Sequence, residues 1–211
     1  MRFSLFFKIF FLTTLMSGCE SNTSFNDEDL NINGEDISDI FILEDNLSNS
    51  LESSYSFIAL GDSYTIGEGV NENERWPNQF VDVAYENGVD FDQPIIIAET
   101  GWKTYDLLNA INQTNFTKKY DYVSLLIGVN NQFNSRPIDE FEQDLNDLME
   151  EMKKIKKNDG SIIIISIPDW GYSPFGESSD MIDISSQIDL FNSSLRKFAS
   201  INNLKLSLIH I

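Results

Sequence analysis

The chain has 211 residues and a formal net charge of −20, from 34 acidic and 14 basic side chains. This length corresponds to one domain with additional segments. The acidic balance excludes a nucleic-acid-binding protein, because a phosphate backbone is bound mainly through Lys and Arg.

The first residues have the pattern of an export signal. Basic Arg2 and Lys8 are followed by a short apolar run and by small residues that lead to Cys19, the only cysteine. The run is too short to span a membrane. Residues 15–19 resemble the lipobox of a bacterial lipoprotein, which implies cleavage before Cys19 and its acylation. The alternative is an ordinary signal peptide or membrane anchor with an incidental cysteine.

A polar, acidic segment follows the signal. No Lys or Arg occurs between Glu20 and Glu74. Such a composition is typical of a disordered tether. We therefore predict a signal peptide at 1–18, a tether at 19–53 and a folded domain at 54–211. The lipidated Cys19 would anchor this exported domain to the membrane of the cell envelope.

The folded part alternates short apolar runs with helical patterns, which predicts a parallel sheet covered by helices. The predicted strands are residues 55–61, 95–98, 122–128, 161–167 and 204–211. The helical patterns begin near Pro77, Leu107, Pro137 and Ile184, and the third ends with four lysines before Gly160. We predict a three-layer α/β/α sandwich with five mostly parallel strands. Because no helix follows the strand that ends at Ile211, we expect a C-terminally incomplete domain that lacks its last helix.

Chemically useful residues follow the first four predicted strands. Ser63 comes after the first strand, Gly101 after the second, Asn130 after the third, and Asp169 with Trp170 after the fourth. The carboxyl ends of parallel strands meet at the edge where such sheets bind ligands. A serine nucleophile with a bare glycine N–H and an asparagine amide suits acyl transfer, which needs donors aimed at an oxyanion.

Three stretches resemble the SGNH (GDSL-type) hydrolases, in particular their bacterial acylhydrolase branch: residues 59–69, 125–132 and 166–171. The resemblance implies a flavodoxin-like fold and a serine esterase that cleaves an acyl or acetyl ester through an acyl-serine intermediate. It makes Ser63 the nucleophile, with its own N–H, the Gly101 N–H and the Asn130 side chain as the oxyanion hole. We expect a small ester substrate, a monomer and no cofactor.

The sequence departs from this family in its last motif. The family's Asp-x-x-His block supplies the base and the acid that orients it, and no such block follows the fourth strand here. The only histidine, His210, lies in the apolar run 206–211, so we do not assign it the role of base. The chain as given is therefore expected to hydrolyse esters feebly. Asn131 stands where many members have aspartate, and either side chain can make a structural hydrogen bond.

The remaining candidates have two interpretations each. Trp102 and Trp170 can line the substrate pocket or simply pack. Asp62 can be an acid partner of the nucleophile or hold its loop, and we expect the second, because adjacent residues near a strand end point apart. We expect no metal, because no His, Cys and Asp cluster has ligand spacing. Lipid ester, thioester and acetylated sugar all remain possible substrates.

Two further functions stay open. One is a non-catalytic surface lipoprotein that binds glycan or peptide in the same pocket. The other is a flavodoxin-like module with residues 63–67 as a phosphate loop, which the acidic stretch 68–74 disfavours.

Overall fold

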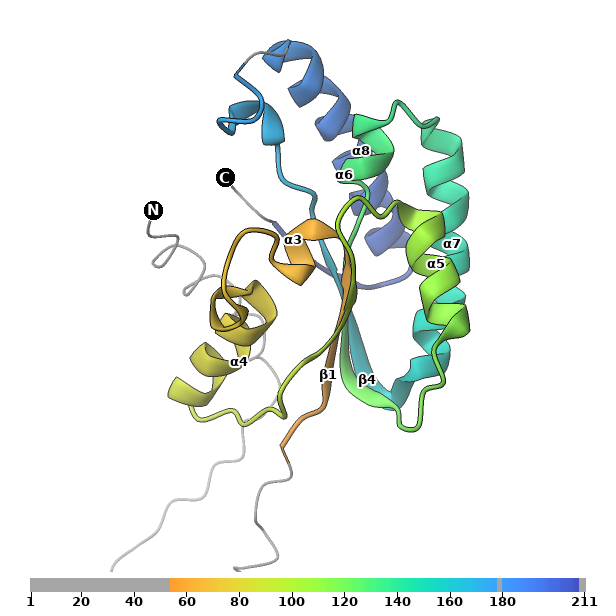
Figure 1. Ribbon diagram of the computed structural model, residues 1–211. Helices are drawn as coiled ribbons and strands as arrows, with labels where there is room; N and C mark the ends of the chain where they lie inside the picture. The colour runs from red at the N-terminus through yellow and green to blue at the C-terminus, as the bar shows by residue number, and fades with distance from the viewer. Residues whose placement is uncertain (1–53, 178–179, 209–211) are drawn as a thin grey trace, which may run out of the picture. The chain divides into compact units, whose positions relative to one another are not determined.

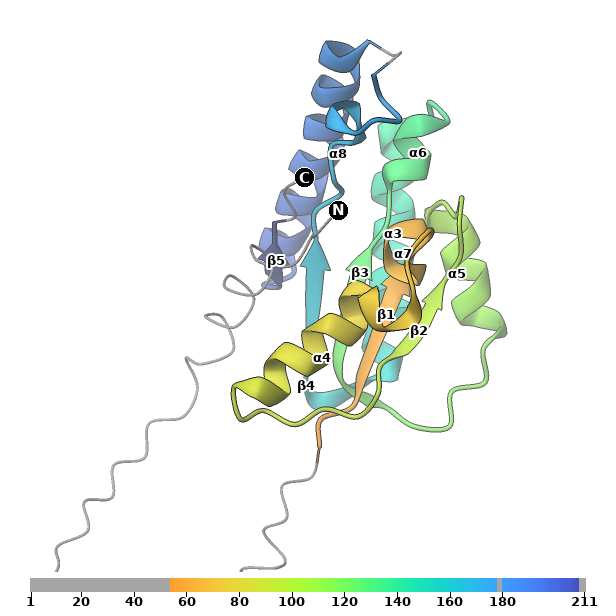
Figure 2. The same cartoon turned by 60° about the vertical axis from the view of Figure 1, so that its left-hand side comes forward.

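The structure, a computed structural model, describes residues 54–177 and 180–208. Within this part of the chain, five parallel strands form one sheet in the order β2-β1-β3-β4-β5 (Figure 2). The strands are β1 (Phe57–Gly61), β2 (Ile95–Ala98), β3 (Tyr120–Leu126), β4 (Lys156–Ile165) and β5 (Lys205–Ser207). This is the strand order of flavodoxin-like folds. The predicted α/β class and five-stranded sheet are confirmed.

Strand β1 lies second in the sheet, between β2 and β3. All five of its residues are buried, as expected for a strand covered on both faces. At its carboxyl end, Gly61 pairs with Ala98 of β2 on one side and with Leu126 of β3 on the other. The strand order reverses between β1 and β3, and ligands bind at such a switch point.

Helices cover both faces of the sheet (Figure 1). On one face lies α4 (Trp76–Glu86), whose Phe80 ring packs 5.3 Å from Phe57. On the opposite face, α5 (Thr104–Gln113), α7 (Ile138–Ile155) and α8 (Met181–Ile201) form the main core with Ile58 and Leu60. Successive strand residues point to opposite faces. Phe57 therefore packs against the layer of α4, and Ile58 packs against the layer of α5, α7 and α8.

The lysine run after the third predicted helix differs from the prediction. Helix α7 ends at Ile155, and β4 already begins at Lys156. The Lys156 ammonium donates to the carbonyl oxygens of Lys157, Asn158 and Gly160 at 2.6, 3.1 and 3.0 Å, which stabilises this irregular start of the strand. The run therefore belongs partly to the sheet, and only its first two lysines form the expected helix end.

Short helices complete the fold. They are α3 (Ser63–Ile66), α6 (Val129–Phe133) and the 3-10 turns η2 (Glu72–Glu74) and η3 (Trp170–Tyr172). In residues 54–177 and 180–208, no helix is long and apolar enough to cross a membrane. The predicted signal and tether, with Cys19, and the C-terminal His210 lie outside the described residues, so the interpretations placed on them stay predictions.

Candidate active site

Ser63 lies directly beyond the carboxyl end of β1. The strand ends at Gly61, Asp62 is the N-cap of α3, and half-buried Ser63 is its first helical residue. A Cβ at Gly61 would lie 2.2 Å from Thr65 Oγ1 and 2.5 Å from the Leu126 carbonyl oxygen, so only glycine fits this tight turn. The single turn of α3 also differs from the longer helix that follows a phosphate loop.

The Asp62 carboxyl is fully buried beneath this turn. Its Oδ1 accepts a hydrogen bond from the Tyr64 N–H at 3.0 Å. Its Oδ2 has no hydrogen-bond partner among the described residues. Burial raises the pKa of Asp62 to about 7, because a carboxylate loses its hydration there. The buried Asp62 side chain therefore stabilises the turn that carries Ser63, which is the structural role expected from the sequence.

Gly101 lies in the loop that follows β2. Its φ of +83° belongs to the left-handed region that glycine adopts without strain. A Cβ at Gly101 would meet no atom within 4 Å, so the space beside this backbone is open. In the same loop, the Thr100 hydroxyl donates a hydrogen bond to the Glu68 carboxylate. This contact joins the Gly101 loop to the loop that follows α3.

Asn130 lies on α6, which follows β3. Gly128 leads into this helix with a φ of +128°, where a Cβ would lie 2.7 Å from the Phe141 ring. The Asn130 Nδ2 donates to the Trp102 carbonyl oxygen at 2.9 Å. A carboxamide nitrogen carries two hydrogens, so the second can serve another acceptor. The bond brings α6 against the residue that follows Gly101.

The structure thus groups the three predicted residues at one edge of the sheet. Ser63 follows β1, and Gly101 and Asn130 follow its two neighbours, β2 and β3. Adjacent strands lie about 4.8 Å apart, and β1 ends at the same level as both of them. The catalytic roles of the three residues stay predictions at this point.

The loop after β4 also reaches this edge. The Asp169 carboxylate accepts hydrogen bonds from the Gly171 N–H at 2.9 Å and the Ser185 hydroxyl at 2.6 Å. The pKa of Tyr64 is raised, first by burial and then by the negative charges of Asp62 and Asp169.

The two candidate substrate-lining tryptophans are placed differently. Trp102 is half-buried and packs against the main core. Trp170 is only 8% exposed, and its indole N–H donates to Gln132 Oε1 at 2.7 Å. Its ring lies 5.4 Å from Phe133 and 5.7 Å from Phe175. Trp170 has little surface left for a substrate, and the lining role of both tryptophans stays a prediction.

Thr104 and Gln132 are buried polar residues beside the site, and the sequence pattern assigns them no role. Asn131 Oδ1 accepts from the Thr104 N–H at 3.1 Å, and Asn131 Nδ2 donates to the Thr104 hydroxyl at 2.8 Å. Asn131 thus makes structural hydrogen bonds of the kind expected. The run of three polar residues at 130–132, shortly after strand β3, is the sequence signal that points to such contacts.

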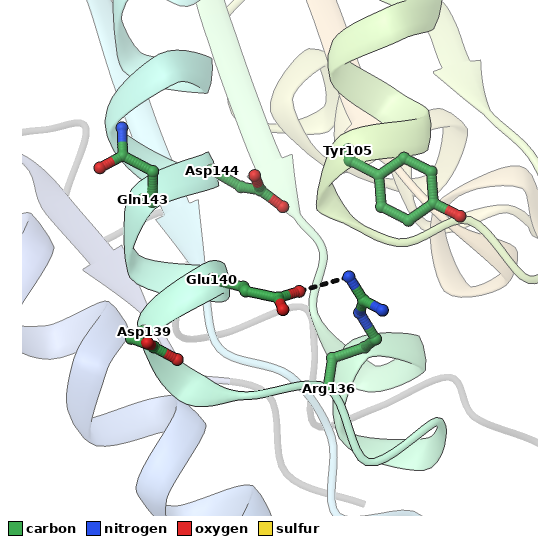
Figure 3. A pocket seen from close by; sticks show the side chains of 6 residues that line it. All are labelled: Tyr105, Arg136, Asp139, Glu140, Gln143 and Asp144. Carbon is green, nitrogen blue, oxygen red and sulfur yellow. Dashed lines mark hydrogen bonds and ion pairs between the residues drawn. The ribbon is translucent and has the colours of Figure 1, made fainter.

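A pocket of about 500 Å³ lies apart from these residues, between α5 and the start of α7 (Figure 3). Its lining residues are Tyr105, Arg136, Asp139, Glu140, Gln143 and Asp144. The Arg136 guanidinium forms an ion pair with Glu140. None of Ser63, Gly101 and Asn130 lines this pocket. Among the described residues, no group of three His, Cys, Asp or Glu side chains could hold a metal ion.

Similar solved structures share this fold. The SGNH-hydrolase family esterase AlinE4 is 19% identical with a TM-score of 0.59, over 74% of this chain and 77% of that chain. The psychrotrophic esterase EstA from Pseudoalteromonas sp., in a structure inhibited by monoethylphosphonate, is 16% identical with a TM-score of 0.57, over 74% and 78%. A GDSL-like lipase from Bacteroides thetaiotaomicron is 15% identical with a TM-score of 0.54, over 81% and 77%.

At these identities the similarity establishes the fold. The comparison with curated proteins found no match. The family model of the GDSL-like lipase/acylhydrolase family matches residues 59–207, which is more than half of the chain and includes Ser63, Gly101 and Asn130. The chain therefore belongs to the GDSL-like lipase/acylhydrolase family.

Proposed function

We propose that this protein is a serine esterase that cleaves a small acyl or acetyl ester through an acyl-Ser63 intermediate. The observation that carries the proposal is the 2.9 Å hydrogen bond from Asn130 Nδ2 to the Trp102 carbonyl oxygen. It joins the candidate carboxamide donor to the Gly101 loop at the edge where Ser63 lies. Family membership supports the proposal, as do the descriptions of AlinE4 and EstA as esterases.

In the proposed reaction, Ser63 Oγ attacks the ester carbonyl carbon while its proton passes to a general base. The carbonyl oxygen becomes an oxyanion that accepts hydrogen bonds from the Ser63 N–H, the Gly101 N–H and the Asn130 Nδ2–H. The C–O bond to the alcohol then breaks and the alcohol takes up a proton. Water attacks the acyl-serine in the same way, which releases the acid and restores Ser63.

No residue is assigned to the general base. The sequence has no Asp-x-x-His block, and its one histidine, His210, lies outside the described residues. An oxyanion hole and binding alone can retain about 10³- to 10⁴-fold catalysis over water when triad members are missing. We therefore expect slow turnover by the 211-residue chain, but measurable reactivity of Ser63.

The test is covalent labelling by a fluorophosphonate, which reports a reactive serine without knowledge of the substrate. We expect the label on the peptide that contains Ser63 and its loss in Ser63→Ala. The matched control is Ser185→Ala, which removes another half-buried serine, bonded to Asp169. A folded protein that stays unlabelled, or a label that survives in Ser63→Ala, would contradict the proposal.

The proposal extends to where the enzyme acts. Acylated Cys19 would anchor a monomeric esterase to the cell envelope, since two or more acyl chains hold a protein firmly on a membrane. Cys19→Ser should then move the protein from the membrane fraction to the soluble fraction of cells that process lipoproteins. Unchanged membrane association would exclude this anchor.

A further inference from the structure

The three polar side chains of α6 contact three different parts of the structure. Asn130 donates to the Trp102 carbonyl oxygen at the candidate oxyanion hole. Asn131 bonds Thr104 at the start of α5. Gln132 bonds Trp170 and Gln187, on η3 and α8. Asn131 and Gln132 are buried, whereas Asn130 is half-buried.

The contacts of Gln132 form a chain of hydrogen bonds with a fixed direction. Its Oε1 accepts from the Trp170 indole N–H at 2.7 Å, and its Nε2 donates to Gln187 Oε1 at 2.9 Å. Gln187 Nε2 in turn donates to Asp183 Oδ2 at 2.7 Å. An indole N–H can only donate and an ionised carboxylate can only accept. Neither carboxamide can therefore flip without losing bonds at both ends.

The contacts of Asn131 hold the opposite side of α6. Both of its side-chain bonds go to Thr104, which is fully buried. The Thr104 hydroxyl donates further to the Asp144 carboxylate of α7. Helix α6 is thus bonded to α5 and α7 through Asn131 and to η3 and α8 through Gln132.

A helix as short as α6 depends on such contacts for its orientation. It has five residues, and its N-cap Gly128 provides no side-chain hydrogen bond. Isolated helices of this length are unstable in water. The direction of the Asn130 carboxamide is therefore set by neighbouring elements, and the Gln132 bonds hold α6 from the side of η3 and α8.

We propose that Gln132, through its bonds to Trp170 and Gln187, is a positioning residue that aims the Asn130 carboxamide at the oxyanion. This inference rests on the proposed function. Gln132 itself need not touch the substrate. Misplacement of a catalytic group by about 1 Å can lower a rate up to about 10²-fold, so the expected effect is kinetic.

The test is a double-mutant cycle read by the rate constant of Ser63 labelling by a fluorophosphonate. Gln132→Met keeps the length of the side chain and removes both hydrogen bonds, and should slow labelling about tenfold. Asn130→Ala should slow it about 10²- to 10³-fold. Adding Gln132→Met to Asn130→Ala should cause no further loss, because the group that it positions is gone. The control, exposed Gln113→Met on α5, should label at the normal rate.

Each contrary outcome has a distinct meaning. A further tenfold loss in the double variant would assign Gln132 a general structural role and overturn this inference alone. A normal rate in Asn130→Ala would overturn the inference and also the proposed oxyanion hole. Should Gln132→Met not fold, Trp170→Phe removes the same indole donor while keeping an aromatic ring, and the same cycle with Asn130→Ala decides.

Discussion

The Asn130 carboxamide and the Trp102 carbonyl oxygen, 28 positions apart in the chain, are joined by a 2.9 Å hydrogen bond. This bond uses one of the two N–H groups of Asn130 and fixes the plane of the carboxamide. The remaining N–H is then held in a defined direction without any substrate present. Donors fixed in advance are those that stabilise a transition state most effectively.

The first prediction concerns the charge at position 130. Asn130→Asp keeps the size of the side chain, removes both N–H donors and places a carboxylate beside the developing oxyanion. We expect labelling of Ser63 to slow by about 10³-fold or more, at least as much as in an alanine variant. Thermal unfolding serves as the control for folding. Labelling within twofold of the normal rate would exclude Asn130 from the oxyanion hole.

The second prediction concerns the turn before Ser63. Gly61→Ala forces a Cβ against Thr65 Oγ1 and the Leu126 carbonyl oxygen, at 2.2 and 2.5 Å. We expect a loss of about 3 kcal/mol in the free energy of unfolding, measured by urea denaturation. Adding Thr65→Ala should recover only part of it, because the backbone clash remains.

A matched control for Gly61→Ala is Gly69→Ala. Gly69 has a φ of +78° but no atom within 4 Å of its would-be Cβ, so only backbone strain is added. That strain costs about 1 kcal/mol. Equal losses in the two variants would show that the close packing around Gly61 contributes nothing.

The third prediction follows from the raised pKa of Asp62. A carboxyl with a pKa of about 7 in the folded protein and 3.8 as its ordinary value favours the folded state most below pH 3.8. That contribution is lost as the pH rises through about 7, because the buried carboxylate must then ionise. Asp62→Asn can still accept the Tyr64 N–H but does not titrate. The free energy of unfolding should therefore fall more steeply from pH 4 to 7 in the wild type than in Asp62→Asn.

The fourth prediction concerns Asp121, at the opposite end of the sheet. Burial by itself raises its pKa, but hydrogen bonds from Lys157 and Ser56 outweigh this effect and hold the pKa below its ordinary value. Asp121 Oδ2 accepts from Lys157 Nζ at 2.8 Å and from the Ser56 hydroxyl and N–H at 2.6 and 2.8 Å. These bonds connect the residue directly before β1 to β3 and β4.

A depressed carboxyl pKa stabilises the folded state above the ordinary value of 3.8, and this stabilisation is lost as the pH falls below it. At pH 7, Asp121→Asn should cost about 1 kcal/mol in the free energy of unfolding. The difference from the wild type should shrink towards pH 3. An exposed control is Asp139→Asn on α7. A difference that stays constant from pH 7 to 3 would contradict the assigned role of the Asp121 charge.

The sheet and the strand-end residues could be predicted because both have simple sequence signals. Continuous apolar runs such as residues 162–165 mark strands buried on both faces. Ser63, Gly101 and Asn130 lie two, three and four residues after the ends of β1, β2 and β3, so the parallel arrangement brings them to one edge. The predicted strand boundaries differ from the observed ones by only a few residues, except at the start of β4. There, Lys156 and Lys157 were predicted to belong to a helix end.

The supporting contacts could not be predicted in the same way. Thr104 bonds Asn131 across 27 positions and Gln132 bonds Trp170 across 38. A pair of polar residues has no periodicity, and either could equally have faced water. The one-turn helices α3 and α6 are too short to show an apolar stripe in the sequence. They depend on a capped turn and on packing against neighbouring elements.

The proposed reaction requires three donors and one nucleophile to meet at a single carbonyl group. The most direct measurement is a crystal structure of the protein after fluorophosphonate labelling. We predict phosphorus bonded to Ser63 Oγ, with the phosphoryl oxygen about 2.7–3.1 Å from Ser63 N, Gly101 N and Asn130 Nδ2. A phosphoryl oxygen that points away from both Gly101 and Asn130 would contradict the account.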